Sequence, residues 1–237
     1  MEEKELKTST GQRIAIGLIG FLMLGSVIAG YVAIVANGSK ASSTGDTIGE
    51  ITDEKKAQYE ADYAEKLATF QSVTASDYAK FIAYKSEVRE YDETAANEGE
   101  VKIKELATGE GRELTEGDTD YLAYYVGYCA DGSIFDSSLD DKTNPTAFSK
   151  AIDASLGMIS GWNTGVTGMK LGGVRRITIP GTLAYGDNME ICGGYNKPLR
   201  FLVMAVAKED PLKTAAAEVD TAYLRVQYAN YGLDYGE

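Results

Sequence analysis

The pattern of apolar and polar residues divides the chain into three regions. Residues 14–36 form a run of 23 residues without a charged side chain, "IAIGLIGFLMLGSVIAGYVAIVA". Residues 51–92 place apolar residues three or four positions apart between Glu and Lys, which predicts helices. From about residue 101 the pattern changes to short runs of aromatic and β-branched residues separated by Gly, Asp and Asn. These runs predict strands at 101–106, 120–128, 174–180 and 199–207.

The helical region predicts two helices. Apolar residues from Tyr59 to Phe70 follow helical spacing, and Ser76 is a suitable N-cap for a second helix that extends toward Tyr91. The pair predicts a hairpin or a broken stalk. A spacer packed on its own aromatic residues is the role that we favour, and a dimerisation arm or substrate cradle is the alternative.

The uncharged run at residues 14–36 is long enough to cross a membrane. At about 1.5 Å per residue it spans the ~30 Å hydrocarbon core with some tilt. The alternative is the apolar part of a cleaved signal peptide, which is usually only about 7–15 residues long. Small residues recur every fourth position at Gly25, Ala29 and Ala33. This spacing can dimerise transmembrane helices, although it also fits a plain anchor.

The charges that flank this run predict its orientation. Lys4, Lys7 and Arg13 precede it, whereas Lys40 follows among several acidic residues. The positive-inside rule therefore predicts a cytoplasmic N-terminus, with the chain after residue 37 outside the cytoplasmic membrane.

The patterns together predict six segments and an α+β domain. Within that domain, residues 148–157 predict the one short helix, and a Gly-rich segment surrounds Trp162. Several strands with one helix favour an α+β fold. The segments are a cytoplasmic tail (1–13), a transmembrane anchor (14–36), a flexible linker (37–50), a helical stalk (51–95), the α+β domain (96–211) and a helical, then Tyr-rich extension (212–237).

The composition excludes several kinds of chemistry. The chain has 237 residues and no histidine, which excludes Ser-His-Asp and Cys-His catalysis and His-ligated zinc. Cys129 and Cys192 are too far apart for a CxxC motif. The formal net charge of −13 opposes binding to a phosphate backbone. We therefore expect no metal, no cofactor and no nucleic-acid partner.

A series of short motifs follows in a specific order between residues 98 and 208. They are a Tyr two residues before a strand-end Gly (Tyr125), "DGSIFDSS", "ISGW", "GMKLGG", "IP" and "LAYG". In this order the chain resembles the FKBP-type peptidyl-prolyl cis–trans isomerases. The resemblance implies a bent antiparallel sheet wrapped around one short helix, with a shallow apolar pocket between them. It also implies isomerisation of X-Pro bonds without covalent chemistry.

The resemblance also assigns the residues of the pocket, although plain core packing is the other interpretation of each aromatic residue. Trp162 is the floor. Asp136 is the polar edge. We favour a role for it as hydrogen-bond acceptor for the Tyr125 hydroxyl over a role as general base, because the chain offers no histidine or second acid to work with it. The N–H of Ile159 and the hydroxyl of Tyr185 contact substrate carbonyls. The walls are Tyr125, Phe135, Met158, Ile159, Tyr185 and Phe201.

Two stretches depart from the family pattern. In "NPTAF", Thr146 stands where the family has a large apolar residue after a proline, which is expected to open one pocket wall. The loop 187–198 carries "CGGY" in place of an apolar Ile-Pro-Pro run, so the catalytic rate and the macrolide affinity stay open. In an oxidising compartment the two cysteines favour a Cys129–Cys192 disulfide, and two separately buried thiols are the alternative.

The sequence thus predicts a prolyl isomerase anchored in the cytoplasmic membrane. Its expected partners are Pro-containing segments of exported or surface proteins, the lipid bilayer through residues 14–36, and a second copy of the chain. One alternative is a non-catalytic chaperone or binding module. Another is a scaffold piece of a membrane complex.

Overall fold

A computed structural model describes residues 49–235 of the chain. Within these residues, no helix combines the length and the apolar character that crossing a membrane requires. The predicted tail (1–13), the anchor (14–36) with its small-residue spacing, and nearly all of the linker lie outside the described residues, so these segments stay predictions.

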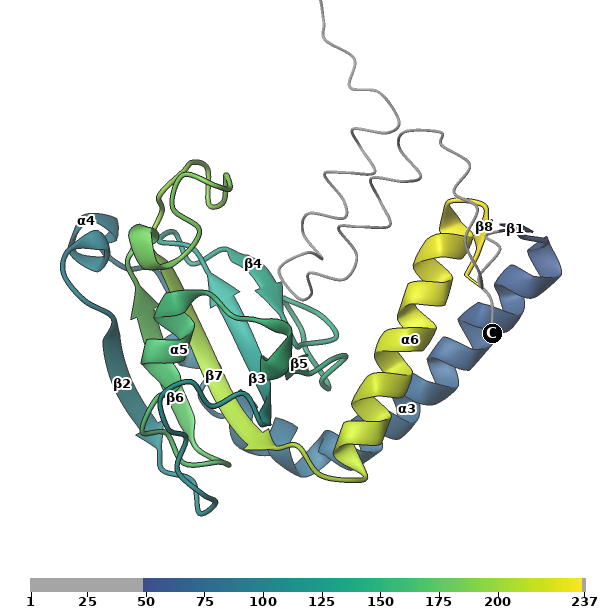
Figure 1. The fold of residues 1–237 in the computed structure, drawn as a ribbon, viewed down its shortest axis with the longest axis horizontal. Coiled ribbons are helices and arrows are strands. Elements are labelled where there is room, and N and C mark those ends of the chain that lie inside the picture. The colour runs from purple at the N-terminus through teal and green to yellow at the C-terminus, as the bar shows by residue number, and fades with distance from the viewer. Residues whose placement is uncertain (1–48, 236–237) are drawn as a thin grey trace, which may run out of the picture. The chain divides into compact units, whose positions relative to one another are not determined.

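A six-stranded antiparallel sheet is the centre of the described fold (Figure 1). The strands pair in the order β2-β6-β7-β3-β4, and the short β5 pairs with β3. The four strands expected from the sequence are confirmed as β2, β3, β6 and β7, and the turn after β3 adds β4. The strands are β2 (Lys102–Ala107), β3 (Tyr121–Tyr128), β4 (Ile134–Ser137), β5 (Ile152–Asp153), β6 (Val174–Ile179) and β7 (Leu199–Ala207).

The two central strands, β3 and β7, are buried on both faces of the sheet. All eight residues of β3 are buried, although their side chains point alternately to opposite faces. The near-continuous apolar run "YLAYYVGY" reflects this two-sided burial, since a strand with one solvated face would alternate with polar residues. Each face therefore needs its own covering element.

The helix α5 (Ser160–Val166) covers one face of the sheet. Two glycines allow its close approach to β6. A Cβ atom on Gly161 would lie 2.2 Å from Cγ2 of Ile179, and one on Gly165 would lie 2.4 Å from Cγ2 of Ile177. Arg175 then binds the carbonyls of Gly165 and Thr167 at the end of this helix, at 3.1 and 2.9 Å.

The short helix predicted at residues 148–157 is wrong. That stretch contains β5 and the 3-10 turn η2 (Ala154–Leu156), and the helix of the domain is the Gly-rich segment around Trp162. Asp153 explains the difference, because its Oδ1 accepts hydrogen bonds from the N–H and hydroxyl of Ser155 at 3.0 and 2.7 Å. Such local side-chain bonds favour a turn over a helix.

The helix α3 (Asp53–Ile82) covers the other face with its C-terminal part. It begins at the N-cap Thr52 and is continuous over 30 residues, so the predicted break at Ser76 is wrong. Phe70 and Phe81 of this helix are fully buried in one core with Tyr124 and Phe148. Tyr124 and Phe148 stack with ring centroids 4.0 Å apart. The predicted stalk thus supplies part of the core of the sheet.

The C-terminal extension forms the predicted helix, α6 (Leu212–Asn230), which lies alongside α3 (Figure 1). Beyond it, β8 (Leu233–Asp234) pairs with β1 (Gly49–Glu50). Asp234 also accepts a hydrogen bond from Lys55 at 2.6 Å. The remaining short elements are η1 (Lys85–Glu87), α4 (Glu93–Asn97) and η3 (Gly181–Leu183).

Candidate active site

Four aromatic rings from four elements form a continuous cluster on the α5 face of the sheet. Trp162 of α5 is 1% exposed, and its ring meets those of Tyr125 on β3 and Phe201 on β7, with centroids 6.0 and 5.4 Å apart. Phe135 of β4 extends the cluster, since its ring centroid lies 5.7 Å from that of Phe201. These three contacts are edge-to-face, a preferred geometry for aromatic pairs.

Gly127 makes room for this cluster. It lies opposite Phe201 on β7 and Asp136 on β4. A Cβ atom at this position would lie 2.5 Å from Cζ of Phe135 and 2.9 Å from Cε1 of Phe201. Any larger residue would therefore push the two rings apart.

A hydrogen bond fixes the orientation of the tryptophan ring. Nε1 of Trp162 donates to the hydroxyl oxygen of Tyr121 at 3.0 Å. Burial raises the pKa of Tyr121 to about 12, so this hydroxyl stays neutral at physiological pH. Tyr121 was not among the residues expected in the pocket. Its position on β3, four residues before Tyr125 and so on the same face, was the available signal.

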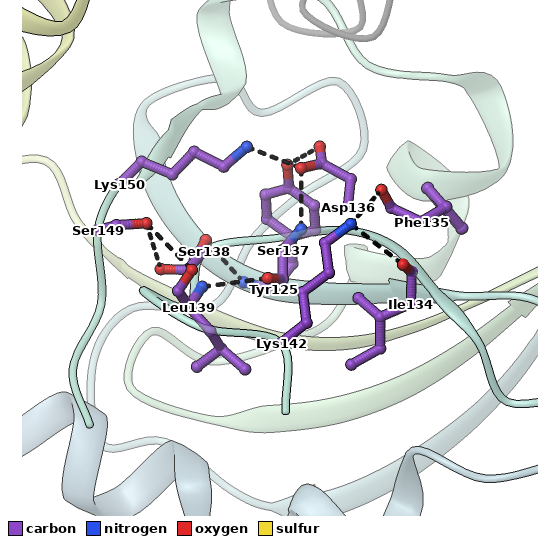
Figure 2. A network of polar contacts seen from close by, with 10 residues as sticks. All are labelled: Tyr125, Ile134, Phe135, Asp136, Ser137, Ser138, Leu139, Lys142, Ser149 and Lys150. Atoms are coloured by element: carbon purple, nitrogen blue, oxygen red, sulfur yellow. Dashed lines mark hydrogen bonds and ion pairs between the residues drawn. The ribbon is translucent and has the colours of Figure 1, made fainter. Parts of the chain in front are cut away.

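The polar edge of the cluster is centred on the carboxylate of Asp136 (Figure 2). The Tyr125 hydroxyl donates to its Oδ2, while its Oδ1 accepts from the N–H of Ser137 and from Nζ of Lys150, both at 2.8 Å. Burial, and then the charge of Asp136, raise the pKa of Tyr125 well above its ordinary value, so the hydroxyl remains a donor. Three donors on one carboxylate favour a structural acceptor over a general base.

Backbone contacts hold the chain segments on either side of this carboxylate. Ser138 and Tyr125 exchange two hydrogen bonds, from the N–H of Ser138 to the carbonyl of Tyr125 at 2.8 Å and from the N–H of Tyr125 to Oγ of Ser138 at 3.1 Å. The N–H of Ser149 donates to the carbonyl of Ser138 at 2.8 Å. Nζ of Lys142 donates to the carbonyl of Phe135 at 2.9 Å (Figure 2).

The remaining residues assigned from the resemblance lie in the segments beside η3 and α5. Tyr185 is half-buried in the segment after η3. Its pKa is raised by burial and then by the charge of Asp136, which indicates its proximity to the polar edge. Ile159 is the N-cap residue of α5, and Met158 precedes it; both are half-buried.

A disulfide ties the loop 187–198 to the end of β3. Cys129 and Cys192 are bonded, with Cα atoms 5.5 Å apart. Cys192 and Gly193 have φ of 54° and 78° and are the central residues of a tight turn closed by hydrogen bonds between Ile191 and Gly194. Positive φ at both central positions is typical of a type I′ turn. The loop that replaces the family's apolar run is thus held by a covalent bond at its tip.

Thr146 does not lie in the core. It is exposed, and its N–H and hydroxyl donate to the carboxylate of Asp140 at 2.9 and 2.6 Å. Phe148, three residues after Pro145, is the buried aromatic residue of this stretch, and it belongs to the core on the α3 face.

Comparisons with known proteins match the part of the chain that holds this site. Residues 111–205 match the family model of FKBP-type peptidyl-prolyl cis-trans isomerases. The chain is 34% identical over 108 residues to an FK506-binding protein of Neisseria meningitidis serogroup C; the aligned region covers 46% of this chain and 93% of that protein. It is 43% identical over 89 residues to FK506-binding protein 3 of Yarrowia lipolytica, which covers 38% of this chain and 20% of that protein.

A solved structure of a peptidyl-prolyl cis-trans isomerase from Pseudomonas syringae pv. tomato is 25% identical and covers 56% of this chain and 94% of that one, with a TM-score of 0.35. The residues of the ring cluster and of its polar edge all fall within the matched range 111–205. The chain therefore belongs to the FKBP-type peptidyl-prolyl cis-trans isomerase family and is an enzyme of that type.

Proposed function

We propose that the chain isomerises X-Pro bonds in exported or surface proteins, that it does so in the pocket around Trp162, and that residues 14–36 anchor it in the cytoplasmic membrane. The observation that carries the catalytic part is the edge-to-face ring cluster with one carboxylate at its edge, which accepts hydrogen bonds from several donors. The membrane and client parts rest on the sequence outside the described residues and on the disulfide.

The chemistry of prolyl isomerisation suits such a site. Rotation about a peptide bond faces a barrier of about 18–20 kcal/mol, because it breaks amide resonance. Uncatalysed X-Pro exchange takes about 10–100 s at 25 °C. No covalent bond forms and no proton has to move. A catalyst needs only to bind the twisted amide more tightly than either planar isomer.

An aromatic pocket meets this need through dehydration. In the twisted amide the carbonyl has lost resonance and is less polarised, so it tolerates an apolar environment better than the planar forms do. The floor on Trp162 and the walls on Tyr125 and Phe201 would receive the proline ring. The N–H of Ile159 and the hydroxyl of Tyr185 would hold the flanking carbonyls.

Two observations support a position outside the cytoplasmic membrane. The positive charges before residue 14 favour a cytoplasmic N-terminus. The bonded Cys129 and Cys192 favour an oxidising compartment, since disulfides are rare in reducing ones. Digestion of intact spheroplasts with proteinase K tests this part. We expect the isomerase domain to be degraded without lysis, whereas a domain protected until lysis would contradict the proposed location.

Catalysis is tested on the full chain in detergent micelles. We expect a catalytic amount to accelerate cis–trans exchange of a Leu-Pro peptide in NMR exchange spectra, and Tyr185→Phe to lower the rate. Tyr78→Phe is the matched control, because the Tyr78 hydroxyl donates to the carbonyl of Pro145 at 2.6 Å and its ring packs on Phe148 of the α3-face core. Equal loss in both variants would contradict the assignment of the site.

One observation keeps a second activity in view. The helices α3 and α6 pair with each other and lie outside the matched residues 111–205. They support the proposal that the chain also holds unfolded segments, either alone or as a homodimer. Suppression of client aggregation only at equimolar chain, with no acceleration of exchange at catalytic amounts, would favour this binding role over the enzymatic one.

A further inference from the structure

We infer that Lys150 determines substrate specificity by allowing the pocket to accept clients with an acidic residue next to the proline. The inference rests on the proposed function, since it assumes that X-Pro bonds are isomerised in the pocket around Trp162. It is carried by Lys150, a residue outside the motifs that assigned the pocket.

The geometry places the ammonium group of Lys150 at the polar edge of the pocket. Its Nζ lies 2.8 Å from Oδ1 of Asp136 and 5.6 Å from the centroid of the Tyr125 ring. The side chains of Lys150 and Asp136 are 23% and 21% exposed, so both contact the site and the solvent. Figure 2 shows the lysine extending from the segment after Ser149 to the carboxylate.

The neighbouring segment holds this lysine in place. The N–H of Ser149 donates to the carbonyl of Ser138 at 2.8 Å, and its hydroxyl donates to the carbonyl of Leu139 at 3.1 Å. These bonds fix the backbone immediately before Lys150 against the chain that follows β4. The ion pair thus joins two segments whose backbones are hydrogen-bonded to each other.

The charges around this edge explain what the lysine does. Asp136 is one negative charge at the rim, and Asp220 of α6 lies close enough to interact electrostatically with Lys150. Asp153 also acts on Asp220, but it is paired with Lys208 at 2.6 Å. With Lys150 present, the carboxylate of Asp136 is compensated. Without it, an acidic residue of a client would approach uncompensated carboxylates on a chain of net charge −13.

The size of the effect follows from Coulomb's law. Unit charges several ångströms apart at a partly exposed site change the ratio of kcat/KM between charged and neutral substrates by about fivefold to tenfold. Dissolved salt screens such an interaction, with a Debye length of about 3 Å at 1 M. A role of Lys150 in folding or in ring placement alone would affect all substrates equally, and salt would not change the ratio.

The test uses the full chain in detergent with the peptides Ala-Glu-Pro-Phe, Ala-Leu-Pro-Phe and Ala-Lys-Pro-Phe. We expect Lys150→Met to lower kcat/KM for the Glu peptide about fivefold to tenfold relative to the Leu peptide, and to raise it for the Lys peptide. Lys150→Arg should keep the wild-type order. In 1 M NaCl the difference should shrink to less than about twofold.

Lys104→Met is the matched control. Nζ of Lys104 lies 2.8 Å from Glu87, the same distance as in the Lys150 pair, but on the α3 face of the sheet. This variant changes the net charge equally and should leave the order of the three peptides unchanged. Thermal melts of each variant check that it is folded.

Three results would overturn the inference. If Lys150→Met changes kcat/KM by the same factor for all three peptides, or does not change it, Lys150 has no role in selectivity while the proposed function stands. If the wild-type chain accelerates none of the peptides, the proposed function fails and the inference fails with it. A change of equal size in Lys104→Met would also overturn it, because net charge alone would then explain the effect.

Discussion

The two faces of the central sheet are both lined by aromatic rings, yet the rings are arranged differently. On the α3 face, Tyr124 and Phe148 stack at 4.0 Å, and Tyr78 and Phe81 meet Phe148 edge to face, each with centroids 5.4 Å apart. On the α5 face, the rings of Tyr125 and Phe201 each meet that of Trp162 edge to face, beside the half-buried carboxylate of Asp136.

The difference teaches how a site can be recognised within a core. On the α3 face, the hydroxyls of Tyr78 and Tyr128 donate to the backbone carbonyls of Pro145 and Glu87 at 2.6 and 2.7 Å. The polar atoms of the α5-face rings are instead held by other side chains, Nε1 of Trp162 by Tyr121 and the Tyr125 hydroxyl by Asp136. Fixed polar atoms at the edge of an apolar surface preorganise it for a ligand. We therefore assign stability to the α3 face and catalysis to the α5 face.

The largest effect is expected from removing the cover of the α3 face. A fragment of residues 96–211 keeps the sheet and α5 but loses Phe70 and Phe81 from the core. We expect this fragment to bind the dye ANS and to unfold without a cooperative urea transition, whereas the full chain unfolds cooperatively. A fragment with the same cooperative transition as the full chain would show that α3 is a dispensable spacer.

The next largest effect is expected from the disulfide. Cys129 and Cys192 are separated by 63 residues, and closing a loop of this length stabilises a fold by about 2–4 kcal/mol. The double variant Cys129→Ser, Cys192→Ser should lose this much free energy of unfolding in urea titrations. Two thiols that alkylate in the folded, unreduced protein would contradict the bond.

A smaller effect is expected from adding one methyl group on the α5 face of the sheet. Gly127→Ala places a methyl group against Phe135 and Phe201, so the rings have to shift. We expect a loss of about 1–3 kcal/mol in stability and a clear drop in kcat/KM in the folded protein. Gly194→Ala is the control, because its Cβ would meet the flexible end of Lys197. Unchanged kcat/KM in Gly127→Ala would argue against a catalytic role of the cluster.

The smallest effect concerns an ion-pair cluster on the α3 face. Glu87 pairs with Lys104 and Arg176 at 2.8 and 2.6 Å. The hydrogen bond from Lys104 and, to a smaller extent, the charge of Arg176 lower the pKa of the Glu87 carboxyl. Because the folded pKa lies below the unfolded one, the stabilisation is present above about pH 4.3 and is lost as the pH falls through the folded value. Glu87→Gln should cost about 1 kcal/mol at pH 7 and almost nothing in strong acid.

Urea titrations of the wild-type chain and of Glu87→Gln across this pH range measure the difference. The values of kcat/KM at pH 7 should agree within about twofold, since the cluster lies on the α3 face. A constant difference in stability at every pH would exclude the linkage.

The sequence supported the strands better than the helices. Continuous apolar runs identified β3 and β7, because two buried faces leave no polar alternation. Ser76 looked like a cap, but helix α3 runs through it, because packing of Phe70 and Phe81 on the sheet outweighs one local signal. The helix at Trp162 was hidden by glycines that seemed to break it, whereas they allow its contact with β6.

The site was foreseen where motifs carry it and missed where only the fold brings residues together. Trp162, Phe135 and Asp136 stand in recognisable local motifs. Lys150 lies 14 residues after Asp136, and no local pattern links the two. The pairing of α3 with α6 joins the two ends of the described chain, a contact that neither helical pattern predicts alone.

The central claim, that the α5 face is the isomerase site, is tested most directly by one pair of variants of the full chain. Trp162→Leu and Phe148→Leu each replace an almost fully buried ring by a smaller apolar side chain, one on each face. The measurement is NMR exchange on folded protein with a Leu-Pro peptide. We predict that Trp162→Leu lowers kcat/KM at least about tenfold, equivalent to about 1.4 kcal/mol. We predict that Phe148→Leu keeps kcat/KM within about twofold of the wild type. Equal losses in the two variants would contradict the claim.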